Sequence, residues 1–199
     1  MKQNLKKGKA GQKNKCTDLG IWILEKATLI AIKAHGKQKR KWEETPFITH
    51  PFLVALKLAK YWFSDIVLAS ALTHDVLEDT NHSVASFREE LGEEVYKLVK
   101  AVSNDPSLPW EEKKLKYIET VRNGPEWSKA IAVADKIHNL EALFIAYKNH
   151  WKKIWKFFHK WKNKKIWFEE KVLKMLRETW DHPMLDEYEM LIKIEKDLE

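Results

Sequence analysis

Residues 66–79 read Ile-Val-Leu-Ala-Ser-Ala-Leu-Thr-His-Asp-Val-Leu-Glu-Asp, so an apolar run ends in one imidazole and three carboxylates: His74, Asp75, Glu78 and Asp79. The apolar part predicts a buried helix. Ionisable groups carried into a core cost several kcal/mol each unless a partner compensates them. A bound divalent cation compensates such a cluster, and the stretch therefore indicates metal chemistry.

Spacing along residues 66–78, which we expect to form one continuous helix, would group these side chains. His74 and Glu78 are four residues apart, as are Asp75 and Asp79. Pairs at this spacing share one face of a helix. Such a helix could present two metal ligands and place two further carboxylates one turn along.

Further ligands must come from elsewhere, and two candidates stand out. His50 precedes Pro51 at the start of an expected helix. Asp135 follows small apolar residues in the segment 132–140, which belongs to the helix expected at about 127–148 and is predicted to be buried. Two imidazoles and two carboxylates make a mixed nitrogen and oxygen set. That set suits Mn, Fe, Co, Ni or Zn better than Ca.

Length and composition favour one helical domain. The chain has 199 residues, 44% hydrophobic and 33% charged, with only six glycines and six prolines. We expect helices at about 18–35, 51–61, 66–78, 83–91, 93–103, 110–122 and 127–148, and two or three more beyond. The predicted fold is all-α: a basic disordered tail at 1–17 and one compact multi-helix domain at 18–199. Residues 148–199 form its C-terminal extension.

Other features of the composition bear on location. No apolar run approaches the roughly 20 residues of a membrane span, and the lysine-rich N-terminus has no following apolar stretch. The single cysteine, Cys16, excludes a disulfide framework and is compatible with a reducing compartment. We therefore expect a cytoplasmic protein.

Positive charge is concentrated in two segments of a chain whose net charge is +7. Residues 1–15 carry six lysines and residues 148–165 carry eight, with no acid in either, which leaves the rest of the chain at −7. Basic patches attract polyanions, whether nucleic acid or a polyphosphorylated small molecule. The second segment also holds an aromatic stripe, for which core or oligomer packing is the default over base stacking: Trp151, Ile154, Trp155, Phe158 and Trp161.

The order His50, His74-Asp75, Asp135 resembles the HD superfamily of metal-dependent phosphohydrolases. The likeness extends over about residues 18–145. Within the superfamily, the chain most resembles the hydrolase domain of RelA/SpoT homologues, in particular the stand-alone small alarmone hydrolases. The motifs that carry it are Ala34-His35, Gln38, Arg40-Lys41, 45–51 (Thr-Pro-Phe-Ile-Thr-His-Pro), 71–75 (Ala-Leu-Thr-His-Asp), Glu78-Asp79-Thr80, 87–92, Ala134-Asp135-Lys136 and Asn139-Leu140.

This resemblance implies a function and a role for each matched residue. The reaction implied is removal of the 3′-diphosphate from guanosine tetra- or pentaphosphate, with release of pyrophosphate and GDP or GTP. The implied metal, usually Mn²⁺, has as ligands His50, His74, Asp75 and Asp135. Glu78 and Asp79 would orient or deprotonate the attacking water, and Arg40, Lys41 and Asn139 would contact the nucleotide. We assign no catalytic role to Lys136 or His138, and leave His35 and Gln38 outside the core site.

Two other functions remain open at this point. One keeps the metal site and changes the substrate to another phosphorylated nucleotide, such as NADPH with its 2′-phosphate. Departures from the family pattern at Glu44 and Trp110 keep this alternative alive. The other is a basic, helical nucleic-acid-binding protein with a degenerate metal site. The sequence does not reveal the oligomeric state.

Overall fold

The computed structural model describes residues 21–40, 44–150 and 162–198, and within these ranges the chain is helical, with a single isolated β-bridge between Lys39 and Pro46. The helices are α1 (Ile21–His35), α2 (Thr49–Ala59), α3 (Asp65–Leu72), α4 (Val76–Asp79), α5 (Val84–Val102), α6 (Trp110–Asn123), α7 (Glu126–His150), α9 (Lys162–Thr179) and α10 (Met184–Asp197). The all-α prediction is confirmed. The tail at 1–17 and the aromatic stripe at 151–161 lie outside the described residues.

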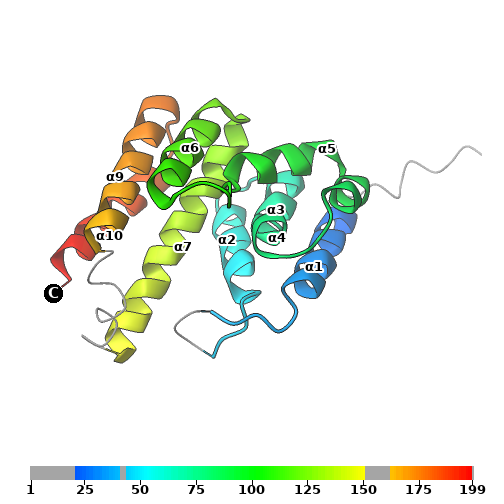
Figure 1. Cartoon of the computed structure of the whole chain (residues 1–199), viewed down its shortest axis with the longest axis horizontal. Helices are drawn as coiled ribbons and strands as arrows, with labels where there is room; N and C mark the ends of the chain where they lie inside the picture. The colour runs from blue at the N-terminus through cyan, green and yellow to red at the C-terminus, as the bar shows by residue number, and fades with distance from the viewer. Residues whose placement is uncertain (1–20, 41–43, 151–161, 199) are drawn as a thin grey trace, which may run out of the picture.

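Helix α7 is the centre of the bundle (Figure 1). It packs against α2, α3, α5, α6 and α10, while α1 and α2 both pack on α3, and α9 packs on α6 and α10. Its residues 130–134, Ala-Ile-Ala-Val-Ala, are fully buried. A helical segment that is apolar on all sides belongs in the interior of a protein. Asp135 follows this segment directly and is therefore held close to the core.

One element differs from its prediction. The expected helix at 66–78 is two helices, because α3 ends at Leu72 and α4 begins only at Val76. The Thr73 hydroxyl donates a hydrogen bond to the Ala69 carbonyl at 2.8 Å, and the His74 ring bonds the Ala71 carbonyl at 2.8 Å. These side chains take over carbonyls of the last turn of α3. His74 and Asp75 therefore lie in a turn rather than on a helix face.

Glycines mark two other helix boundaries. Gly36, with φ 47°, follows the end of α1, and Gly92, with φ 86° and ψ 169°, interrupts α5 in the middle. L-residues with a side chain rarely adopt such a positive φ. The predicted separation of residues 83–91 and 93–103 near Gly92 is thus confirmed as a kink. Among the described helices, none is both long and apolar enough to cross a bilayer.

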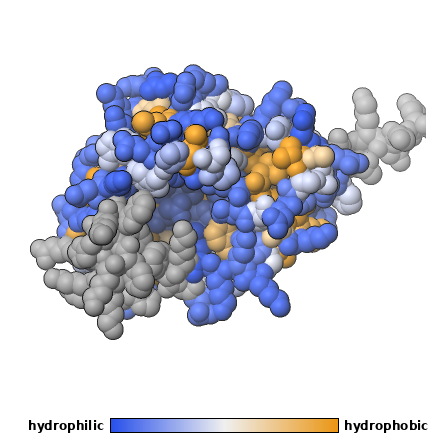
Figure 2. All heavy atoms as spheres, viewed as in Figure 1, coloured by the Kyte–Doolittle hydropathy of each residue, from blue (hydrophilic) through white to orange (hydrophobic). Residues whose placement is uncertain are grey.

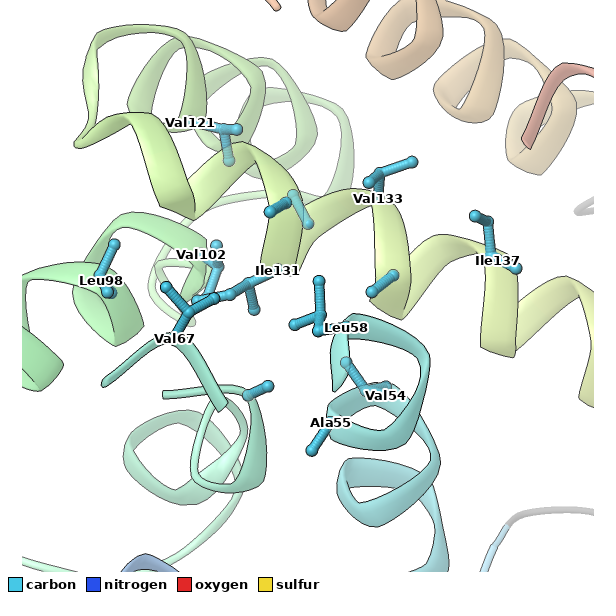
Figure 3. Packing of buried hydrophobic residues seen from close by; sticks show 14 of the residues in the cluster. Val54, Ala55, Leu58, Val67, Leu98, Val102, Val121, Ile131, Val133 and Ile137 are labelled. Atoms are coloured by element: carbon cyan, nitrogen blue, oxygen red, sulfur yellow. The ribbon is translucent and has the colours of Figure 1, made fainter. Parts of the chain in front are cut away.

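The core joins α2 to α7, and Figure 3 shows Leu58 of α2 pointing towards Ile131 of α7. Both side chains are fully buried. Val54 and Ala55, one turn earlier in α2, belong to the same cluster. Since α2 begins with Thr49-His50 and α7 contains Asp135, this contact fixes the distance between two segments of the candidate site.

Replacing Leu58 by Ala should therefore lower the free energy of unfolding by about 2–5 kcal/mol, the usual cost of a large cavity in a core. Leu56→Ala is the matched control on the same helix, because Leu56 is 59% exposed, and it should cost less than about 0.5 kcal/mol. Urea unfolding monitored by circular dichroism measures both. Equal losses for the two variants would contradict the assigned core.

Candidate functional site

A cavity of about 770 Å³ opens beside α7, and the front face in Figure 2 is hollowed over this helix. One side is formed by the loop between α1 and α2 together with α4, and the other by α6 and α9. Nearly every residue predicted for the site lines it: Arg40, His50, His74, Asp75, Glu78, Asp79, Asp135 and Asn139. Lys41 lies outside the described residues.

The four predicted metal ligands meet at one end of the cavity. His50 Nε2 lies 3.1 Å from Asp135 Oδ1 and 3.5 Å from Asp75 Oδ2. His74 Nε2 lies 3.2 Å from the same Asp75 oxygen and 3.8 Å from the same Asp135 oxygen. The four atoms thus form a ring in which nitrogen and oxygen alternate, brought together from α2, the α3–α4 turn and α7.

The spacing of these atoms fits a single divalent ion. Bonds of about 2.1 Å place neighbouring ligands at right angles about 3 Å apart. Candidate ligand atoms of His50, His74 and Asp135 all lie within 4.8 Å of one another. His74 Nε2 is buried and has no hydrogen-bond partner among the described residues. In the unprotonated imidazole this nitrogen is available as a metal ligand. The donor set can therefore hold the ion that the sequence predicts.

Both imidazoles are oriented by hydrogen bonds from their second nitrogen. A backbone carbonyl only accepts, so His74 must donate Nδ1–H to Ala71 and keep its Nε2 lone pair free for the cluster. His50 Nδ1 lies 2.7 Å from His138 Nδ1. Burial, followed by the charges of His50 and Arg40, lowers the pKa of His138 to about 4. His138 is therefore neutral at pH 7 and can accept the His50 proton, which leaves His50 Nε2 as a ligand.

The carboxylates are held ionised by their neighbours. Burial alone would raise the pKa of Asp135, but Lys136 and the two imidazoles of the cluster bring it well below its ordinary value. The Lys136 ammonium lies 2.9 Å from Asp135 Oδ2. Burial also opposes the charge on His74, yet Asp75 and Asp135 raise its pKa well above normal. Burial lowers the pKa of His50, so it is His74 whose proton is favoured beside the two carboxylates.

Glu78 is fixed by a chain of donors that begins at Lys114. The Lys114 ammonium can only donate, and it lies 3.3 Å from Asn104 Oδ1. The Asn104 amide group must then turn its Nδ2 towards Glu78, at 3.1 Å from Oε1, and the Asn104 backbone N–H donates to Oε2 at 2.7 Å. These hydrogen bonds fix the orientation of the Glu78 carboxyl group where it lines the cavity.

Arg40 and Asn139 form a second directed chain. The Arg40 guanidinium donates to Asn139 Oδ1 at 3.3 Å, and Asn139 Nδ2 then donates to Asp135 Oδ1 at 2.6 Å. Arg40 also lies over the Phe47 ring at 6.0 Å. Two of the predicted substrate-contacting residues therefore adjoin the metal cluster and are held in place by it.

Three residues that matter to this geometry were given no role by the sequence analysis: His138, Asn104 and Lys136. The sequence analysis assigned His138 no catalytic role, and the structure places its ring in contact with that of His50. Its spacing was the available signal, since residue 138 is three positions after Asp135 and shares its helix face. Asn104 gave no such signal, because it approaches Glu78 only through the folding of α5 against α4.

Comparison with known proteins identifies the family of this chain. Residues 27–157 match the model of the HD domain family, so the chain belongs to the HD domain family. It is 38% identical to the mouse and human proteins named guanosine-3′,5′-bis(diphosphate) 3′-pyrophosphohydrolase MESH1 over 124 residues, which are 61% of this chain and 69% of theirs. A protein of the same activity name from Aquifex aeolicus is 33% identical over 134 residues, 66% of this chain and 19% of that one.

Solved structures show the same fold. One, described as a metazoan ortholog of SpoT that hydrolyses ppGpp, superposes with a TM-score of 0.74 at 27% identity, over 86% of this chain and 94% of its own. Another, from Listeria monocytogenes, gives a TM-score of 0.68 at 34% identity, over 74% of this chain and 99% of its own. The predicted likeness to the hydrolase domain of RelA/SpoT homologues is confirmed.

The wall formed by α6 and α9 carries an unusual lysine. Burial, and then the charge of Lys136, lowers the pKa of Lys114 to about 8. Lys136→Met should therefore raise this pKa, because a neighbouring positive charge is removed. Titration of ¹³C-labelled lysine side chains by NMR measures it, with Lys114→Arg to assign the signal. A Lys114 pKa that is the same in both proteins would contradict the coupling.

Proposed function

We propose that this protein is a metal-dependent hydrolase that removes the 3′-diphosphate from guanosine tetra- or pentaphosphate, giving pyrophosphate and GDP or GTP. The observation that carries the proposal is the ring of His50, His74, Asp75 and Asp135 atoms beside the Glu78 carboxyl group in a lysine-lined cavity. Its support from outside the chain is the activity in the names of the MESH1 relatives. A cytoplasmic location stays a prediction.

Each group of residues has a distinct part in this reaction. His50, His74, Asp75 and Asp135 would hold a divalent ion, Mn²⁺ by family resemblance, which would supply Lewis acidity at the phosphate and lower the pKa of a bound water molecule. Glu78, with Asp79 beside it, receives the proton of the attacking water. Arg40 and Asn139, and by the same prediction Lys41, bind the nucleotide. Lys114 and Lys136 offset the negative charge of the substrate, which would otherwise oppose its entry among the acidic ligands.

The decisive experiment is turnover by the metal-reconstituted protein. Guanosine tetraphosphate and NADPH are supplied side by side, and the release of pyrophosphate and of phosphate is followed. The proposal expects pyrophosphate from the first substrate and a much slower reaction of the second. Absence of turnover while the protein holds one equivalent of Mn²⁺ would contradict the proposed function. Preferential release of phosphate from NADPH would favour the alternative in which NADPH is the substrate.

Glu78→Gln tests the proton acceptor. The substitution preserves size but removes the charge and replaces one acceptor oxygen by an NH2 group, so kcat should fall about 10²–10⁴-fold, while the metal content measured by elemental analysis stays at the wild-type level. Glu94→Gln, on the exposed side of α5, is the control and should keep full activity. A kcat within a few-fold of wild type for Glu78→Gln would show that another group accepts the proton.

His138→Leu tests the orientation of His50. Loss of the acceptor behind a ligating imidazole typically weakens metal binding about 10–100-fold, and the same loss is expected here. Isothermal titration of the apo protein with Mn²⁺ gives the dissociation constant. His82→Leu is the matched control, because His82 lies near Glu90 on α5, away from the cluster, and its affinity should be that of wild type. Equal affinity in the two variants would rule out the orienting role.

A further inference from the structure

Helices α9 and α10 hold a cluster of three ionisable side chains at the edge of the cavity, two buried glutamates and one partly buried lysine. The Lys165 ammonium lies 3.0 Å from Glu169 Oε1 and 2.9 Å from Glu195 Oε1. Glu169 and Glu195 are 3% and 1% exposed. One lysine is therefore shared by two buried carboxylates, and the cluster carries a surplus negative charge.

The two carboxylates are not equivalent. Glu169 Oε2 also accepts a hydrogen bond from the buried Tyr188 hydroxyl. Neither oxygen of Glu195 has a hydrogen bond of good geometry among the described residues, although Lys165 is its ion-pair partner. Burial raises the pKa of Glu195 above its ordinary value in spite of the lysine. Among the described residues, compensation of a negative charge on Glu195 thus depends on Lys165, whereas Glu169 has Tyr188 as a second partner.

Stability does not explain such a cluster. Replacing a buried ion pair by apolar side chains of similar volume is often neutral or stabilising. An apolar residue at position 195 would suit the interface between α10 and its neighbours at least as well. The charge of Glu195 calls for a reason connected with what Lys165 does.

The position of the cluster supplies that reason. Lys165 and Glu169 line the cavity, while Glu195 lies behind them and is not part of the lining. On the same wall, the Lys114 and Lys136 ammonium groups lie over the Phe168 ring at 4.8 and 5.3 Å. Helices α9 and α10 also lie beyond residues 27–157, which match the HD domain model. The α9 part of this wall, with Lys165 and Glu169, is therefore supplied by a part of the chain outside that match.

Resting on the proposed function, we propose that Lys165 binds a second anionic group of the substrate and that Glu195 competes with this group for the lysine. The pair then acts as a selectivity element for nucleotides that carry phosphate at two positions. One phosphate group reaches the metal cluster, and the other must displace Glu195 from Lys165. Nucleotides phosphorylated only at the first position leave the ion pair intact and gain nothing from it.

The consequence is opposite to that of removing an ordinary binding residue. Glu195→Gln keeps the shape of the side chain but releases the Lys165 charge, so a doubly phosphorylated nucleotide should bind roughly three- to tenfold more tightly. Lys165→Met should weaken its binding by a similar factor. The double variant Lys165→Met/Glu195→Gln should match Lys165→Met alone, because Glu195 acts only through the lysine.

Direct binding separates this inference from the proposed reaction. Isothermal titration of the metal-loaded full chain with guanosine 3′,5′-bisphosphate and with guanosine 3′-monophosphate needs no turnover. Glu195→Gln should tighten the first and leave the second unchanged, and Lys171→Met, an exposed lysine on α9, should change neither. If the protein hydrolyses no guanosine tetraphosphate but this pattern holds, the proposed function fails and the selectivity element stands.

Two results would overturn the inference. One is an unchanged affinity of Glu195→Gln for the bisphosphate, and the other is an equal change for both nucleotides, which would indicate a general effect on the fold. Lys165→Met leaves two buried carboxylates without their cation and can unfold the α9–α10 pair. Glu195→Gln avoids this, since it removes a charge that needs compensation. The double variant leaves only Glu169 without the lysine, and Glu169 keeps its hydrogen bond from Tyr188. Thermal unfolding of each variant confirms that the comparison is made on folded protein.

Discussion

Two carboxylates and two imidazoles meet in the interior of this protein, and their charges must balance there. Asp75 and Asp135 both contact His50 Nε2, so their negative charges lie close enough to repel one another. A proton on His74, whose pKa is raised by these carboxylates, or a divalent ion can offset the charges. Lys136 supplies one further positive charge at 2.9 Å from Asp135. The surrounding bundle, with the apolar run of α7 at its centre, brings together groups that would otherwise be kept apart in water.

Directed hydrogen bonds decide which atom each functional group presents. The chains begin or end at groups that can only accept or only donate: the Ala71 carbonyl, the Arg40 guanidinium and the Lys114 ammonium. From these fixed points the orientations of His74, Asn139 and Asn104 follow without further assumption. A site built in this way is oriented before a substrate arrives, which is the condition for effective electrostatic catalysis.

Sequence reasoning found what local pattern encodes and missed what tertiary contact creates. The helices, the kink at Gly92 and the ligand candidates follow from periodicity, glycine positions and the order of the acidic and imidazole residues. The break after Leu72 was missed because the run from Ile66 to Leu77 is uniformly apolar, and only the Thr73 and His74 side-chain bonds to carbonyls end the helix. The partner of Glu78 is 26 residues away in the chain, and no local pattern points to such a pairing.

The two walls of the cavity depend on different parts of the chain. The wall with the metal cluster comes from α2, the α3–α4 turn and α7, within residues 27–157, and its chemistry follows from the HD motifs. The opposite wall comes from α6 and α9, and α9 is held by α10 through the ion pairs of Lys165. On the role proposed for Lys165 and Glu195, a residue of α10 changes how a nucleotide binds without contacting the four proposed metal ligands. Substrate choice could then vary among proteins that share these ligands, because α9 and α10 lie outside the matched region whereas α6 lies within it.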